Sequence, residues 1–146
     1  MNSTIKNYYE LCKPNVVLMM LICAFVGSLL ATKTMAPLSL IGLSMLGIGL
    51  CASSAAAINQ IIDRKVDANM SRTEKRPIPQ GEISPLKASI FALFLGVLGA
   101  AILVLYVNTL TALLTLGSLI GYAFVYTVYL KRATPQNIVI GGLAGA

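Results

Sequence analysis

The chain has 146 residues, of which 57% are hydrophobic and only 11% are charged. This composition excludes a disordered chain and is atypical of a soluble domain. The net charge of +6 raises the question of nucleic-acid binding. The basic residues lie in short segments between apolar runs, however, which is a membrane-topology pattern, so we expect no nucleic-acid partner. The sequence contains no histidine, which excludes histidine-based catalysis by these residues.

Four apolar runs are each long enough, or nearly so, for a transmembrane helix, which needs roughly 20 residues. They cover residues 14–31, 38–62, 88–107 and 110–130, and a fifth run begins at Ile138. The first run exceeds the 7–15 apolar residues typical of a signal peptide, so we interpret it as a span. We therefore expect an all-α, polytopic transmembrane helix bundle. It has four complete spans and the start of a fifth, and we expect residues 1–146 to form a single integral-membrane domain that is truncated within this fifth helix.

Local signals predict several helix ends and one packing surface. Ser84 and Pro85 are typical of the first residues of a helix, and Pro37 suits a helix start. Small residues, which let membrane helices approach closely, concentrate in the second run. They are Gly42, Gly47, Gly49, Ser53, Ser54 and Ala55, Ala56 and Ala57. The three cysteines, Cys12, Cys23 and Cys51, form no C-x-x-C pair, and we expect three small buried thiols.

The distribution of basic residues predicts the orientation in the membrane. If the N-terminus is cytoplasmic, only Lys33 lies outside, and ten basic residues lie inside, which agrees with the positive-inside rule. Both polar segments, 63–83 and 131–137, then face the cytoplasm. The ten cytoplasmic residues are Lys6, Lys13, Arg64, Lys65, Arg72, Lys75, Arg76, Lys87, Lys131 and Arg132.

A charged segment, residues 59–83, interrupts the apolar chain and holds four of its five acidic residues. Asn59, Asp63 and Asp67 are spaced four apart, so they share one face of any helix that continues through them. Two carboxylates and an amide oxygen are hard ligands suited to Mg²⁺, which prefers a partner phosphate. This spacing suggests a metal site at the membrane surface.

Three basic residues follow the aspartates and extend the hypothesis to a metal-bridged diphosphate. Arg72 and Arg76 offer bidentate contacts to phosphate, and Lys75 offers a point charge. Spacing alone leaves two alternatives open. A solvated helix end with charge partners four residues apart could be formed by Asp63, Arg64, Lys65 and Asp67. The basic residues could serve only to set topology and bind anionic lipid head groups.

Two stretches resemble a known family. The pattern NxxxDxxxD, followed by R-T-E-K-R-P-I-P at residues 72–79, resembles the UbiA superfamily of intramembrane prenyltransferases. The stretch Y-L-K-R-A-T-P-Q-N-I-V-I-G-G-L-A-G-A, residues 129–146, is similar to the branch of protohaem IX farnesyltransferases, or haem O synthases. L-C-K-P at residues 11–14 and Met70 fit that branch too. Asn15 departs from it, since a basic residue is expected after Lys-Pro.

The resemblance implies nine transmembrane helices around a central cavity, with two aspartate-rich motifs on the cytoplasmic side. It implies transfer of a farnesyl group from farnesyl diphosphate to a vinyl group of protohaem IX (haem B), which gives haem O for terminal oxidases. The implied cofactor is Mg²⁺, bound by the catalytic residues Asn59, Asp63 and Asp67 and bridging the diphosphate. Haem B is then a substrate. The implied diphosphate-binding residues are Arg72, Lys75, Arg76, Lys131 and Arg132.

Several expectations depend on that resemblance. The second aspartate motif is expected beyond Ala146, so these 146 residues alone are expected to be inactive. The lack of an Arg/Ser-rich leader favours a bacterial plasma membrane over a mitochondrial one. One alternative is another branch of the superfamily, acting on 4-hydroxybenzoate or a chlorophyll precursor. The other is a non-enzymatic membrane transporter or scaffold. A haem A synthase or oxidase-assembly partner cannot be read from the sequence.

Overall fold

The computed structural model describes residues 3–31, 37–71 and 73–130, and these residues form helices joined by turns, with no strand among them. The first three helices are α1 (Ser3–Leu11), α2 (Pro14–Leu30) and α3 (Leu38–Asp67). Helix α4 (Pro85–Ile102) continues as a π-helix, η1 (Leu103–Val107). Helix α5 (Thr109–Ile120) continues as a second π-helix, η2 (Gly121–Leu130). The all-α prediction is confirmed.

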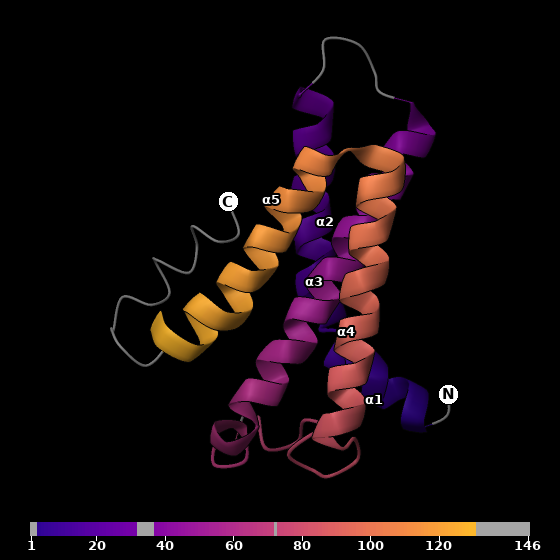
Figure 1. Cartoon of the computed structure of the whole chain (residues 1–146). Helices are drawn as coiled ribbons and strands as arrows, with labels where there is room; N and C mark the ends of the chain where they lie inside the picture. The colour runs from indigo at the N-terminus through magenta and orange to yellow at the C-terminus, as the bar shows by residue number, and fades with distance from the viewer. Residues whose placement is uncertain (1–2, 32–36, 72, 131–146) are drawn as a thin grey trace.

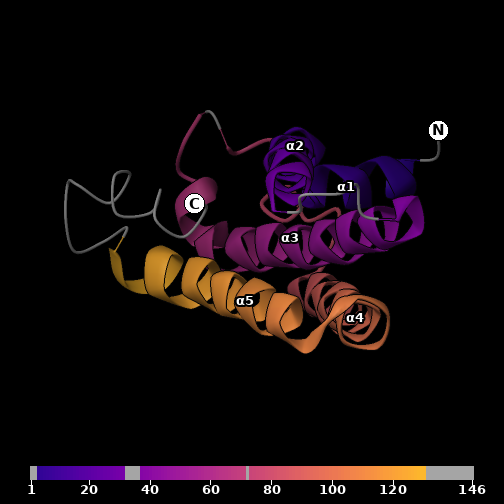
Figure 2. The same cartoon turned by 90° about the horizontal axis from the view of Figure 1, so that it is seen from above.

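Helix α3 is the centre of the bundle. Figure 2 shows α1 and α2 on one side of α3, and α4 and α5 on the other. Figure 1 shows α1 and the segment that joins α3 to α4 at one end, and the junction of α4 with α5 at the opposite end. The charged residues that follow α3 therefore lie at the same end of the bundle as the N-terminal helix.

The helices are those of a polytopic membrane protein. Leu38–Asp67 and Pro85–Val107 are each long and apolar enough to cross a membrane. Ser3–Leu11 and Pro14–Leu30 together qualify as a third span, bent by 47°, and Thr109–Ala123 is a shorter apolar helix. Helices thus cover all four predicted runs, although only two or three meet the length of a span. The fifth predicted run lies outside the described residues.

The predicted helix ends are correct where the signal is local. Ser84 Oγ accepts a hydrogen bond from the backbone N–H of Lys87, with Pro85 in the first turn of α4. Asn108 caps α5 in the same way, because its Oδ1 accepts from the N–H of Thr111 at 2.6 Å. Helix α3 begins directly after Pro37. These caps satisfy backbone donors that a helix N-terminus otherwise leaves unpaired.

Small residues bring α3 and α4 into close contact, as the sequence predicts. A Cβ added at Gly99 would lie 2.8 Å from the carbonyl oxygen of Gly47, so neither helix leaves room for a side chain there. Ser54 Oγ donates to the carbonyl oxygen of Ala92 across the same interface at 2.7 Å. Gly42, in contrast, has no atom within 4 Å of an added Cβ and does not belong to this contact.

The expectation of three buried thiols is wrong. Cys51 is buried, Cys12 is half-buried and Cys23, on α2, is exposed on the surface of the described chain. Helix α2 is apolar on every side and has no buried residue. Its sequence therefore carries no signal for the side that faces protein rather than lipid.

Candidate functional site

A row of buried polar side chains occupies the last three turns of α3. Asn59 is 5% exposed, Asp63 2% and Asp67 3%. Because α3 continues to Asp67, the three residues share one face, as their spacing predicts. Arg64 and Lys65 are exposed. The alternative of a solvated helix end is therefore wrong for the two aspartates.

Asp67 is held by the segment that follows it. Arg76 Nη1 lies 2.6 Å from Asp67 Oδ2, and Arg76 keeps 29% of its side chain exposed. Buried Thr73 donates from its Oγ1 to the backbone carbonyl of Asp67 at 3.0 Å. The chain therefore turns back over the end of α3 and brings a cation to the carboxylate nine residues earlier.

Apolar residues of the same segment fix this return. Ile78 and Ile83 are 6% and 3% exposed and pack in one core cluster with Leu11 of α1, Ala57 of α3 and Ala88 of α4. The segment is thus not a solvated loop. Its apolar side chains pack into the bundle, and this packing holds Arg76 beside α3.

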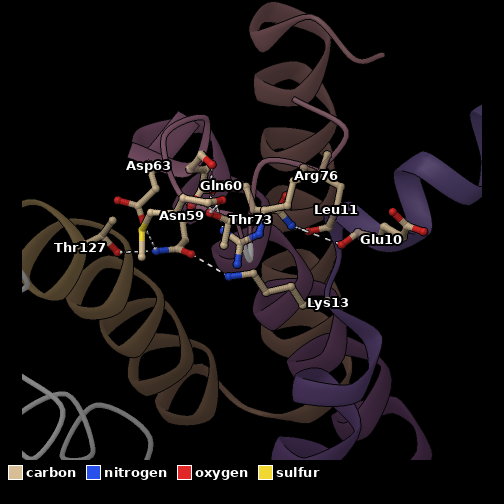
Figure 3. A network of polar contacts seen from close by, with 11 residues as sticks. Glu10, Leu11, Lys13, Asn59, Gln60, Asp63, Thr73, Arg76 and Thr127 are labelled. Atoms are coloured by element: carbon tan, nitrogen blue, oxygen red, sulfur yellow. Dashed lines mark hydrogen bonds and ion pairs between the residues drawn. The ribbon is translucent and has the colours of Figure 1, made fainter. Parts of the chain in front are cut away.

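Asn59 is the point at which three parts of the chain meet (Figure 3). Its Oδ1 accepts a hydrogen bond from Lys13 Nζ at 2.7 Å. Its Nδ2 donates to Asp63 Oδ2 at 3.2 Å and to Thr127 Oγ1 at 3.0 Å. Thr127, fully buried on η2, in turn donates to the carbonyl oxygen of Tyr122. The amide of Asn59, at the end of α3, thereby links the corner between α1 and α2 to η2.

Gln60 ties the same corner to α3 from the next position. Its Nε2 donates to the backbone carbonyls of Glu10 and Leu11 at 3.2 and 3.1 Å, which are at the end of α1. Carbonyls at a helix C-terminus lack intrahelical partners, so Gln60 supplies a donor to Leu11 and a second donor to Glu10, whose carbonyl also accepts from the N–H of Lys13. Two adjacent residues of α3 therefore fix the corner that carries Lys13.

The structure brings some of the predicted site residues together and leaves others apart. It brings Asn59, Asp63, Asp67 and Arg76 together at the end of α3, whereas Lys75 is exposed. Arg72, Lys131 and Arg132 lie outside the described residues.

Sequence reasoning missed several polar residues of the site: Lys13, Gln60, Thr73 and Thr127. Lys13 contributes to the positive-inside count and to the L-C-K-P stretch, but a lysine directly before an apolar run is common at a membrane surface, so its position gives no signal of a contact with Asn59. A hydroxyl inside an apolar run, such as that of Thr127, carries no such signal.

The two carboxylates are donors that a magnesium ion could bind. Asp63 and Asp67 are one helical turn apart, which puts their Cβ atoms about 5–6 Å from each other. Asn59 Oδ1 accepts from Lys13, but an amide oxygen has two lone pairs and can take a second partner. No group of three or more His, Cys, Asp or Glu side chains gathers in the described part of the chain. Water and phosphate oxygens would therefore complete the six ligands that Mg²⁺ requires.

The charges of the described residues that contact one another at the site are balanced. Asp63 and Asp67 contribute two negative charges, and Lys13 and Arg76 contribute two positive ones, each through the contacts given above. Buried carboxylates require such compensation because removing a charge from water costs several kcal/mol. The compensation comes from both sides of α3, and a divalent cation would leave the site net positive and suited to an anion.

Residues 20–146 match the UbiA prenyltransferase family. The chain is 60% identical over 141 residues to the protoheme IX farnesyltransferase of Saccharophagus degradans, and the alignment covers 97% of this chain and 46% of that protein. It is 58% identical to the protoheme IX farnesyltransferase of Legionella pneumophila, with 97% and 48% covered. It is 57% identical to protoheme IX farnesyltransferase 1 of Pseudomonas putida, again with 97% and 48% covered. The chain thus spans about half the length of these curated relatives. No solved structure is significantly similar to it.

Proposed function

Because the chain belongs to the UbiA prenyltransferase family, we propose that the protein transfers a farnesyl group from farnesyl diphosphate to a vinyl group of protohaem IX (haem B), which gives haem O. Relatives at 57–60% identity over 97% of the chain bear the name protoheme IX farnesyltransferase, which supports this substrate pair. The observation that carries the proposal is the pair of buried aspartates at the end of α3, one of them bound to Arg76.

We propose that Asp63, Asp67 and Asn59, the last through its Oδ1, hold Mg²⁺ at this site. The ion would supply Lewis-acid stabilisation of the diphosphate as it leaves the allylic carbon. Both carboxylates are buried, so few waters would compete with the diphosphate oxygens for the ion.

Arg76 is the basic residue whose contacts best support a role in diphosphate binding. Its guanidinium is fixed by Asp67 and still partly exposed, so it can add a stationary positive charge where negative charge develops. Lys75 is exposed on the same segment and can approach a bound diphosphate from outside. Arg72, Lys131 and Arg132 complete the proposed diphosphate-binding set.

The proposed location is the bacterial plasma membrane, with the N-terminus and both polar segments in the cytoplasm. Helix α1 and the segment after α3 lie at the same end of the bundle, which supports one orientation for both (Figure 1). Ten of eleven basic residues then follow the positive-inside rule. We further propose that the chain is part of one integral-membrane domain, whose second aspartate motif lies outside these residues.

The test is farnesyl transfer by membranes that contain the protein expressed from its whole reading frame. With haem B, farnesyl diphosphate and Mg²⁺, mass spectrometry should detect haem O. Asp63→Asn and Asp67→Asn should each abolish the product while the protein still inserts in the membrane. Glu74→Gln is the matched control, because Glu74 is an exposed acid on the adjacent segment.

Two results would contradict the proposal in different ways. Prenylation of 4-hydroxybenzoate with haem B unchanged would assign the protein to another branch of the family. Absence of haem O with the wild-type protein, together with a cellular function that survives both aspartate changes but not the replacement of Arg76, would favour the non-enzymatic scaffold.

A further inference from the structure

Lys13 occupies a backbone position for which lysine is poorly suited. It lies between α1 and α2 with φ 50° and ψ 62°, the left-handed region, and no other described residue except glycine has a positive φ. Glycine and asparagine adopt this region most easily, and a following proline disfavours helical backbone angles further. Lys13 is also the N-cap of α2, but its side chain cannot accept the hydrogen bond that a capping side chain normally accepts.

The local backbone of the corner gives no reason for a lysine. The N–H of Lys13 donates to the carbonyl of Glu10, and its carbonyl accepts from the N–H groups of Val16 and Val17. Any residue that tolerates the left-handed region would make these bonds. A costly conformation that the surroundings maintain is a common feature of functional sites, so the reason must be sought in the side chain.

The side chain of Lys13 reaches the candidate site. Its ammonium lies 2.7 Å from the amide oxygen of Asn59, 46 residues later in the chain. An ammonium only donates hydrogen bonds, and an ionised carboxylate only accepts them. Lys13 therefore requires the oxygen of the Asn59 amide, and Asp63 requires its nitrogen, so the two together allow one orientation of the amide. Thr127 accepts from the same nitrogen and agrees with that orientation.

From this geometry, we propose that Lys13 is a positioning residue of the metal–diphosphate site. Its ammonium fixes the direction of Asn59 Oδ1 and thereby the donor from Asn59 to Asp63. The corner that presents Lys13 is held by Gln60, whose Nε2 donates to the carbonyls of Glu10 and Leu11. The inference rests on the proposed function in assigning Mg²⁺ and diphosphate to the site, and it adds Lys13 to the residues that prepare it.

The experiment measures Mg²⁺-dependent binding of inorganic diphosphate to the purified protein, expressed from its whole reading frame, by calorimetry. Lys13→Met removes the ammonium and should weaken binding about tenfold, since a hydrogen bond from a charged group is lost. Lys13→Arg keeps a group that only donates and should restore binding close to that of wild type. Lys6→Met is the matched control, because it removes one positive charge from α1 at an exposed position paired with Glu10.

A second set of variants separates positioning from direct contact and from backbone effects. In an Asn59→Ala background, Lys13→Met should weaken binding no further, because Lys13 acts through Asn59. The effects of Lys13→Met and Asn59→Ala on the unfolding midpoint should likewise be smaller together than the sum of the two single effects. Lys13→Gly suits the left-handed backbone, so its unfolding midpoint should be at least that of Lys13→Met, while its diphosphate binding stays weak.

Three results would overturn the proposal: unchanged binding in Lys13→Met, an undiminished Lys13→Met effect in the Asn59→Ala background, or wild-type binding in Lys13→Gly. They differ from failure of the proposed function. If the wild-type protein transfers no farnesyl group to haem B but the variants change diphosphate binding as expected, the proposed function is wrong and the role of Lys13 stands. If the wild-type protein makes haem O but the binding effects of Lys13→Met and Asn59→Ala are additive, the function stands and the role of Lys13 is wrong. A wild-type protein that binds no diphosphate with Mg²⁺ would overturn both.

Discussion

The ion pair between Asp67 and Arg76 joins the end of α3 to the segment that leads into α4, and replacing Asp67 by Asn removes it. Breaking a fully buried pair costs about 3–5 kcal/mol, whereas an exposed pair contributes at most about 1 kcal/mol. Asp67 is buried, but Arg76 keeps 29% of its side chain exposed and can be rehydrated when it loses its partner. We therefore expect Asp67→Asn to lower the free energy of unfolding by about 2 kcal/mol, between these limits.

The assay is urea-induced unfolding of the purified protein in detergent, applied to Asp67→Asn, Arg76→Gln and the double variant. Because the Nη1 and Oδ2 atoms are 2.6 Å apart, the two changes remove the same interaction. The double variant should then lose less stability than the sum of the single ones, by about 1–2 kcal/mol. Lys6→Met removes an exposed pair with a 3.9 Å separation and should change stability by less than about 0.5 kcal/mol.

The reasoning would be refuted if the two single changes were additive, or if Asp67→Asn were as stable as the wild type. Either result would mean that Arg76 does not compensate the buried carboxylate. The segment after α3 would then be held by Ile78 and Ile83 alone. A change in the urea dependence rather than in the midpoint would instead report an altered unfolded state.

Three further predictions concern helix α3 and its contact with α4. Gly99→Ala should destabilise the protein by about 1–3 kcal/mol in the same unfolding assay, because the new Cβ would lie 2.8 Å from the carbonyl oxygen of Gly47. Gly42→Ala should instead raise the free energy of unfolding by about 0.5–1 kcal/mol, because alanine is favoured over glycine inside a helix and no atom lies within 4 Å of the added Cβ. Ser54→Ala should cost about 1 kcal/mol through loss of its 2.7 Å bond to the carbonyl of Ala92, and an unchanged midpoint would contradict it.

The sequence predicts those features that depend on neighbouring residues. Ser84 and Pro85 begin α4 as expected, because a cap and the first turn are only a few residues apart. Asn59, Asp63 and Asp67 share a face because the helical period relates them as soon as α3 extends to Asp67. Their roles as metal ligands remain a prediction.

Features set by distant packing could not be predicted in the same way. In a soluble bundle the apolar side of a helix identifies the core, but a membrane helix is also apolar where it faces lipid. Cys23 on α2 is accordingly exposed, although it lies within an apolar run as buried Cys51 does. Thr127 reaches Asn59 from η2, 68 residues away, and nothing near it in the sequence indicates that contact.

The balance of charge at the end of α3 shows most clearly what the structure adds. Several basic residues are near Asp63 and Asp67 in the sequence, yet Arg64 and Lys65, on the same helix, are exposed. Among the described residues, the cations that contact this network are Arg76, returned by a packed segment, and Lys13, held at the α1–α2 corner through Asn59. Asp67 therefore already has a cation beside it, and a divalent cation would add two further positive charges to the site. This charge count supports the proposal that the diphosphate binds together with its metal ion.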